Sequence, residues 1–207
     1  MFLKSALAVG LILTATAVLA EPVGNRISGK LKSDSERCQE CHGAEGFSVS
    51  EKIPNHAGQQ AAYLIKQLAD FQSGRRHHET MSVMAADLDD ADRADIAAYF
   101  ASQKMMQGDG SVGLASGLAK SLLQKGDDNR HLPACASCHG ENAKGRLADG
   151  VVYPVLAGQR KIYLRTQLVN WKLAERTNSL DGVMNKIAQQ LSDDEIEALS
   201  SYLAGLR

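Results

Sequence analysis

The sequence predicts an all-α protein made of two tandem copies of one domain. Motifs of the first half recur in the same order in the second half, about 100 residues later. The apolar residues between these motifs follow the three- and four-residue spacing of amphipathic helices. No segment alternates convincingly between apolar and polar residues, as a half-buried strand would.

The first 20 residues have the form of a secretory signal peptide. Lys4 supplies a positive charge, residues 5–18 are uncharged and largely apolar, and the small residue Ala20 ends the stretch. The apolar run is shorter than the roughly 18–20 residues that a membrane span needs. We therefore expect cleavage after Ala20 and export to a compartment where thiols oxidise unless another group binds them.

Composition excludes several classes of protein. Of the 207 residues, 44% are hydrophobic and 23% are charged, which is ordinary for a folded chain and argues against disorder, collagen and coiled coil. The formal net charge of -1 offers no basic surface to nucleic acid. The ten aromatic side chains (four Phe, five Tyr and one Trp) are few for two small cores. We expect another group to fill part of each core.

The repeat consists of three matched blocks. The first, Cys38-Gln-Glu-Cys41-His42-Gly43, recurs 97 residues later as Cys135-Ala-Ser-Cys138-His139-Gly140. The second, Pro54-Asn-His-Ala57-Gly58-Gln59 with Tyr63-Leu64 and Gln67-Leu68, recurs 100 residues later as Pro154-Val-Leu-Ala157-Gly158-Gln159 with Tyr163-Leu164 and Gln167-Leu168. In the third, Met81, Leu88 and Tyr99 recur 103 residues later as Met184, Leu191 and Tyr202. The growing offset indicates two short insertions in loops of the second copy.

Each copy should contain the same elements in the same order. Glycine-rich polar loops follow the cysteine pairs, at 43–54 and 140–154. A helix comes next, with an apolar stripe of Ala61, Leu64, Ile65, Leu68 and Phe71, or of Ile162, Leu164, Leu168 and Trp171. A polar loop then holds Met81 or Met184.

The last element of each copy is a helix that begins near Asp89 or Ser192. Ser192 and Glu195 have the spacing of a capping box, in which two side chains satisfy free backbone N–H groups. The apolar stripe is Ile96, Tyr99 and Phe100, or Ile196, Leu199, Leu203 and Leu206. Glycine and small polar residues at 107–113 indicate a flexible linker, and a helix is expected over 114–125. The domains are therefore residues 21–106 and 114–207.

Cys-x-x-Cys-His is the attachment signature of c-type haem. Cys38 and Cys41, and again Cys135 and Cys138, can form thioethers to one haem edge, and the adjacent His42 or His139 can bind the iron. Zinc would need the cysteine pairs closer together, and a thioredoxin-like pair would need strands around it. A disulfide between residues three apart is strained and leaves both histidines unexplained. Two covalent haem c groups also account for the scarcity of aromatic residues.

The sixth iron ligand decides the chemistry. After His139 the second copy contains one methionine, Met184, and no histidine. In the first copy Met81 and Met84 compete, and His77 and His78 lie nearby. Met81 precedes Leu88 by seven residues, as Met184 precedes Leu191, so we expect Met81 to be the ligand and Met84 to pack in the core.

With these motifs, residues 21–207 closely resemble the dihaem cytochrome c4 family. The resemblance implies two class I cytochrome c domains related by a pseudo-twofold axis, with haem propionate edges facing across the interface. It also implies that the carbonyls of Pro54 and Pro154 accept the proton of each proximal imidazole, fixing the ring. The segment Arg75-Arg76-His77-His78 differs from Arg176-Thr-Asn178 in copy two, which leaves the geometry of that loop open.

Two irons with His and Met ligands leave no open position for a substrate, so we expect an electron carrier and no enzyme. The resemblance suggests transfer from a quinol-oxidising complex to a terminal oxidase or reductase, in the periplasm and in peripheral contact with the membrane. The alternatives are a cytochrome subunit of a dehydrogenase, such as a flavocytochrome, and a dihaem oxidoreductase with its own substrate. The other histidines, His56, His77, His78 and His131, are expected to be solvated and without a role.

Charge is unequal between the two halves. Residues 21–106 carry 13 acidic and 10 basic side chains, and residues 107–207 carry 11 and 12. Much of the excess is the run Asp87, Asp89, Asp90, Asp92 and Asp95. We expect this run to favour the start of a helix, and the alternative is that it orients the molecule between two redox partners.

Overall fold

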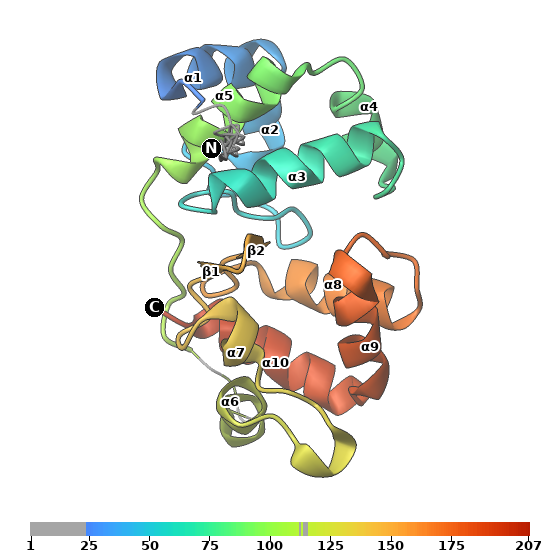
Figure 1. The fold of residues 1–207 in the computed structure, drawn as a ribbon. Helices are drawn as coiled ribbons and strands as arrows, with labels where there is room; N and C mark the ends of the chain where they lie inside the picture. Colours follow the sequence, from blue (N-terminus) through green and yellow to red (C-terminus); the bar gives the residue numbers. More distant parts are fainter. Residues whose placement is uncertain (1–23, 112, 114–115) are drawn as a thin grey trace, which may run out of the picture.

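The computed structural model describes residues 24–111, 113 and 116–207. The predicted signal peptide and its cleavage site therefore lie outside the described residues. Figure 1 shows the two halves of the chain stacked one above the other, with residues 102–111 running along one side from the first half to the second. The prediction of two tandem, mainly helical domains is confirmed.

The first domain contains five helices. They are α1 (Arg26–Ser35), α2 (Cys38–His42), α3 (Ala61–Gln72), α4 (Glu79–Met84) and α5 (Asp90–Ala101). Helix α1 packs along α5, and α3 packs against α5 from another side. The sequence did not lead us to expect α1; the Asn25 side chain begins it by accepting from the N–H groups of Ile27 and Ser28.

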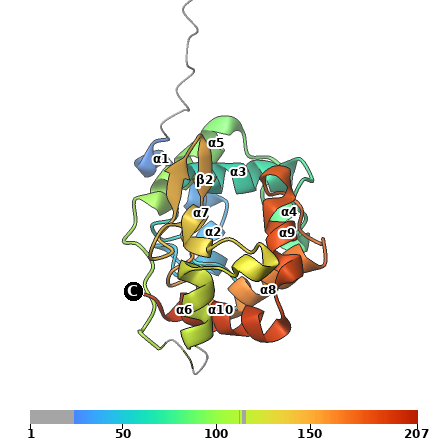
Figure 2. The ribbon, with the colours of Figure 1, turned by 60° about the horizontal axis from the view of Figure 1, so that its bottom comes forward.

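The second domain repeats this plan. Its helices are α6 (Ser116–Gln124), α7 (Cys135–His139), α8 (Lys161–Lys172), α9 (Val183–Gln190) and α10 (Asp193–Gly205), with 3₁₀ turns at Asp128–Arg130 and Leu180–Gly182. Helix α6 lies against α10, as Figure 2 shows, in the position that α1 has against α5.

Most residues of the predicted apolar stripes lie in, or pack against, the hydrophobic cores of the two domains. Ile96, Tyr99 and Phe100 of α5 are buried with Leu64 and Phe71 of α3. In the second domain the core comprises Ile196, Leu199 and Leu203 of α10 with Leu164 of α8 and Leu122 and Leu123 of α6. Ile162, placed in the predicted stripe of α8, is instead 42% exposed.

Both last helices begin with a capping box. In α10 the Ser192 side chain accepts from the Glu195 N–H and the Glu195 side chain accepts from the Ser192 N–H, as predicted. Asp89 and Asp92 do the same at the start of α5. Asp92 also pairs with Lys32 at 3.0 Å, and Asp95 accepts from the Asn25 N–H at 2.6 Å. These contacts support the interpretation of the acidic run as a helix start.

The expectation of a loop over 140–154 is wrong in part, because a short hairpin forms there. Strand β1 (Arg146–Ala148) pairs antiparallel with β2 (Val151–Tyr153). Asp149 and Gly150 connect the strands with φ of 52° and 74°. An Asp-Gly pair with two positive φ angles is the preferred two-residue hairpin turn, and Val and Tyr favour strands.

The predicted methionine loops are also wrong in part. Met81 lies inside α4 and Met184 inside α9. The His78 ring begins α4 by accepting from the Met81 N–H, and the Ser179 hydroxyl accepts from the Met184 N–H. The His78 cap and the Ser179 hydrogen bond stabilise short helices in segments whose polarity suggested loops.

The predicted linker contacts the end of the chain. The N–H groups of Gly108 and Gly110 donate to the carbonyls of Leu206 and Gly205 at 2.6 and 3.0 Å. Met106, just before these residues in the sequence, has a side chain that is only 1% exposed. Residues 112 and 114–115 of the expected linker and helix lie outside the described part. No helix of the described residues is long and apolar enough to cross a membrane.

Candidate functional site: two Cys-x-x-Cys-His helices and their shared interface

The two cysteine motifs form the one-turn helices α2 and α7. No disulfide joins the four cysteines, Cys38, Cys41, Cys135 and Cys138, in the part of the chain that the structure describes. Burial raises the pKa of the Cys38 thiol, and burial raises the pKa of Cys135 to about 11. Redox-active cysteines have a lowered thiol pKa instead. The raised pKa of Cys38 and of Cys135 therefore does not fit a thioredoxin-like reaction.

The histidine of each motif is buried and held in one orientation. His42 and His139 are 7% and 8% exposed. Their Nδ1 atoms lie 3.0 Å from the carbonyl oxygen of Pro54 and 3.1 Å from that of Pro154. A carbonyl only accepts, so each Nδ1 carries the proton. Burial lowers the pKa of both imidazoles, which leaves the Nε2 lone pair of a neutral ring free to bind a metal.

The candidate methionines differ in their surroundings. Met81 packs against the buried core of the first domain, whereas Met84 is not among the residues that do so. This is the reverse of the packing role expected for Met84. In the second domain Ile187, the counterpart of Met84, does pack against the core. Met81 and Met184 are both half-buried.

His56 was expected to be solvated, and this is wrong. Its ring stacks on His42 with 4.0 Å between ring centroids and meets Phe100 edge-on at 5.5 Å. Burial is the largest cause that lowers the pKa of His56 well below its usual value, and the nearby His42 is the second. The repeat explains the position, because the counterpart of His56 is the core residue Leu156.

The two histidine-holding loops meet at the interface between the domains. The Gln59 amide accepts from the Val155 N–H at 2.9 Å and donates to the Val155 carbonyl at 3.0 Å. The Gln159 amide makes the same pair of bonds to Asn55, at 2.7 and 2.9 Å. Reciprocal contacts of this kind are what a twofold relation between two copies produces.

A second reciprocal set joins α3 and α8. Arg76 donates to Gln167 and Tyr163 of the other domain, and Arg176 donates to Gln67 and Tyr63. Each guanidinium also lies over an aromatic ring, Phe71 for Arg76 and Trp171 for Arg176, at 4.6 and 4.3 Å. Neither forms an ion pair within 4.0 Å with a carboxylate of the described residues. Arg176 is buried and Arg76 is half-buried, and an anionic partner stabilises cations in such positions.

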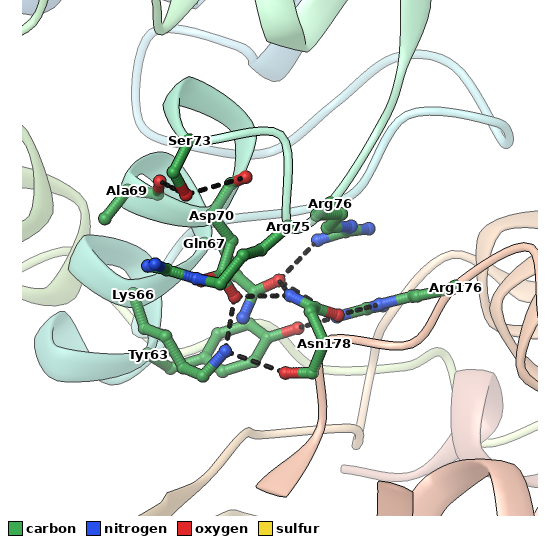
Figure 3. A network of polar contacts seen from close by, with 10 residues as sticks. All are labelled: Tyr63, Lys66, Gln67, Ala69, Asp70, Ser73, Arg75, Arg76, Arg176 and Asn178. Carbon is green, nitrogen blue, oxygen red and sulfur yellow. Dashed lines mark hydrogen bonds and ion pairs between the residues drawn. The ribbon is translucent and has the colours of Figure 1, made fainter.

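Asp70 makes the interface asymmetric. Its buried carboxylate accepts from Lys66, from Arg75 at 2.8 Å and from Asn178 of the other domain at 2.6 Å (Figure 3). Burial alone would raise the pKa of this carboxyl, but the three hydrogen bonds outweigh burial and hold the pKa below its usual value. The counterpart in the second domain is the uncharged Asn170.

Sequence reasoning assigned no role to these interface residues, although a signal was present. Polar residues recur at four-residue spacing on the predicted helices of both copies: Gln59, Tyr63 and Gln67, then Gln159, Tyr163 and Gln167. Such a stripe shows which residues share a face, but it does not show that the two stripes face each other.

The donor set fits two haem groups. Each half offers two cysteine side chains on one helical turn, an imidazole with a free Nε2 and a methionine thioether. The buried Arg176 and the half-buried Arg76 supply positive charge for a cofactor that carries carboxylates. Among the described residues, no cluster of three or more His, Cys, Asp or Glu forms an alternative metal site.

Comparison with known proteins gives a consistent result. The cytochrome c family model matches residues 29–104 and 125–207. Cytochrome c4 of Pseudomonas aeruginosa is 39% identical over 202 residues, covering 97% of this chain and 98% of the relative. The crystal structure of reduced recombinant cytochrome c4 from Pseudomonas stutzeri superposes with a TM-score of 0.82 at 36% identity, covering 89% of this chain and 100% of the other.

A relative with a different name is also similar. The thiosulfate dehydrogenase electron acceptor of Stutzerimonas stutzeri is 36% identical over 174 residues, covering 82% of this chain and 78% of the relative.

Proposed function

Because this chain belongs to the dihaem cytochrome c4 family, we propose that it carries electrons in the periplasm from a quinol-oxidising complex to a terminal oxidase or reductase. Two haem c groups are covalently attached, and the protein is an electron carrier. The observation that supports the proposal most strongly is the pair of buried histidines, each held through Nδ1 by a proline carbonyl. The two histidine-holding loops contact each other across one interface.

In this proposal each domain binds its haem in the same way. Cys38 and Cys41, and Cys135 and Cys138, would hold the haem groups through thioethers. His42 and His139 would bind iron through Nε2, and Met81 and Met184 would supply a second iron ligand in each domain. The bound haem supplies an iron that gains or loses one electron, and a thioether ligand favours the ferrous state. An iron held by both a histidine and a methionine of the chain would leave no ligand position for a substrate.

The chain's own residues keep the sites dry and fixed. The Pro54 and Pro154 carbonyls orient the imidazoles. Arg76 and Arg176 would offset the charge of the haem carboxylates. Buried and half-buried glutamine and tyrosine side chains hold these guanidiniums in place. A fixed environment of this kind reduces the rearrangement that accompanies gain of an electron.

The second candidate is an electron acceptor for a dehydrogenase, and the 36% identical thiosulfate dehydrogenase electron acceptor favours it. It needs the same haem sites and differs only in the donor. A dihaem enzyme with its own substrate is less consistent with this chain, because all four cysteines belong to the attachment motifs.

The experiment measures second-order rates of haem reduction by two donors. One donor is the isolated quinol-oxidising complex with quinol, and the other is thiosulfate dehydrogenase with thiosulfate. Reoxidation is then measured with a terminal oxidase. Fast reduction by the first donor and fast reoxidation support the proposal. Fast reduction by the second donor alone supports the acceptor function.

Cleavage after Ala20 is tested separately, by measuring the mass of the exported protein.

A further inference from the structure

We infer that Gln59 and Gln159 are positioning residues, each of which tunes the haem of the opposite domain through the peptide group that orients the histidine there. The inference rests on the proposed ligation of iron by His42 and His139. It assigns a role to the last residue of each Ala-Gly-Gln segment, which the sequence alone left without one.

A chain of hydrogen bonds runs from His42 into the second domain. The His42 Nδ1–H donates to the Pro54 carbonyl at 3.0 Å. The carbonyl of Pro54 and the N–H of Asn55 belong to the same peptide group. That N–H donates to Oε1 of Gln159 at 2.7 Å. The histidine, the peptide group and the glutamine amide are therefore linked head to tail across the interface.

The same chain runs in the other direction. The His139 Nδ1–H donates to the Pro154 carbonyl at 3.1 Å. The N–H of the same peptide group, on Val155, donates to Oε1 of Gln59 at 2.9 Å. Each proximal histidine is thus connected to a side chain that the other domain supplies.

The glutamine amides are fixed in the orientation that the chain requires. Gln59 and Gln159 are 3% and 4% exposed. Each Nε2 donates to the carbonyl of the residue whose N–H its Oε1 accepts. Each Oε1 also accepts from the N–H of the next residue in its own chain, Gln60 or Arg160. A flipped amide would lose all of these bonds, because its NH₂ group would face N–H donors.

These contacts affect the iron through polarisation. When the N–H of a peptide group donates a hydrogen bond, its carbonyl oxygen becomes a stronger acceptor. A stronger acceptor at Nδ1 raises the basicity of the imidazole toward a metal. A more basic ligand stabilises ferric over ferrous iron, so each glutamine lowers the reduction potential of the opposite haem.

The test is a pair of variants with a crossed readout. Gln159→Leu leaves the Asn55 N–H without its acceptor and should raise the potential of the haem on His42. Gln59→Leu should raise the potential of the haem on His139. One hydrogen bond of ordinary strength changes the ferric-to-ferrous ratio at fixed potential by about three- to tenfold, and tenfold corresponds to about 59 mV for one electron.

Redox titration followed by NMR measures the two haems separately. Through-space contacts between the protons of each haem and those of its attached cysteines assign the haem methyl signals to one domain. Gln60→Leu is the matched control: the Gln60 amide also crosses the interface, to the Tyr153 carbonyl at 3.0 Å, but does not bond the peptide N–H. Gln159→Glu is the conservative variant, since a protonated carboxyl offers the same acceptor and donor to Asn55. At fixed potential, the ferric-to-ferrous ratio of this variant should stay within threefold of the wild-type ratio.

The inference is supported if Gln159→Leu and Gln59→Leu each shift the reduction potential of the haem in the opposite domain. Gln60→Leu should shift neither potential. The inference is overturned if each variant shifts the haem of its own domain, if both haems shift equally, or if Gln60→Leu has the same effect. If the Leu variants do not fold, failure of Gln159→Glu to retain the wild-type potentials overturns it as well. Failure of the proposed function would appear differently, as a wild-type protein without two titrating haems.

Discussion

Arg76 and Arg176 donate to the same two side-chain amide oxygens, Oε1 of Gln67 and Oε1 of Gln167. Arg76 reaches Gln67 in its own domain and Gln167 in the other, both at 2.8 Å. Arg176 reaches Gln167 at 2.8 Å and Gln67 at 3.0 Å. The four side chains form a closed ring that joins the domains. The two like charges in this ring repel each other, and an anion close to the ring would offset that repulsion.

Removing one member of the ring should destabilise the protein. Arg176→Ala removes one of the two charged donors from both Gln67 and Gln167, leaves the Tyr63 hydroxyl without its charged partner and exposes the face of Trp171. We expect the free energy of unfolding of the holoprotein to fall by about 2–4 kcal/mol, because hydrogen bonds from charged donors are lost in a buried site. Denaturant unfolding followed by far-ultraviolet circular dichroism measures this change.

The control is Arg75→Ala, in the neighbouring position. The Arg75 side chain is 64% exposed, and Asp70 keeps its bonds from Lys66 and Asn178 when Arg75 is removed. We expect a loss of less than about 1 kcal/mol. Equal losses in the two variants would contradict the role given to the ring.

The ligand prediction for the first domain is tested by two methionine variants. Met81→His should lower the potential of one haem, because loss of the thioether removes the preference for ferrous iron. It should also halve the charge-transfer band of Met-ligated ferric haem. Met84→Leu should leave both quantities unchanged. Spectroelectrochemical titration measures both, and the opposite pattern would make Met84 the ligand.

Acid should destabilise the second domain through Glu195. Hydrogen bonds from Arg130, 2.7 and 3.0 Å long, hold the pKa of the Glu195 carboxyl below its usual 4.5. A lowered carboxyl pKa in the folded state contributes stability above the unfolded pKa, and this contribution is lost as pH falls through the folded value. Unfolding free energies measured from pH 6 to pH 3 should therefore decline less in Glu195→Gln than in wild type.

Glu197→Gln is the comparison variant, since that carboxylate is 48% exposed and pairs with Lys161 and Arg165 on the surface. It should keep the wild-type decline. The same slope in Glu195→Gln and wild type would show that the buried ion pair does not titrate in this range.

The turn that presents Gln59 requires glycine. Gly58 has a φ of +66°, and a Cβ there would lie 2.3 Å from the Cα of Met105. Gly58→Ala should cost at least about 1–3 kcal/mol of stability, because a strained backbone and a clash with the main chain combine. Gly117→Ala in α6, where a Cβ meets nothing within 4 Å, should be neutral or stabilising by up to about 1 kcal/mol. Thermal unfolding of both variants tests the contrast, which similar melting temperatures would contradict.

Much of the fold could be predicted from local patterns. Leu64 and Phe71, or Ile196, Leu199 and Leu203, are buried because their spacing places them on one face of a helix. The Ser192–Glu195 box depends on four consecutive residues, so its sequence was sufficient. The hairpin was missed because Asp149-Gly150 lies in a glycine-rich stretch in which a turn and a loop look alike.

The interface could not be predicted in the same way. The contacts of Gln59 with Val155 and of Gln159 with Asn55 join residues about 100 positions apart. Their geometry depends on how two finished domains pack, which no local pattern determines. His56 was misjudged for a related reason: its neighbours, Phe100 and His42, come from α5 and α2.

The most direct test of the account is a redox titration of the purified holoprotein combined with exposure of its reduced form to carbon monoxide at neutral pH. Two covalently bound haems with His and Met ligands should titrate as two one-electron steps, and carbon monoxide should leave the reduced spectrum unchanged. A carbon monoxide adduct on either haem of the native protein would show an open iron position and contradict the electron-carrier account.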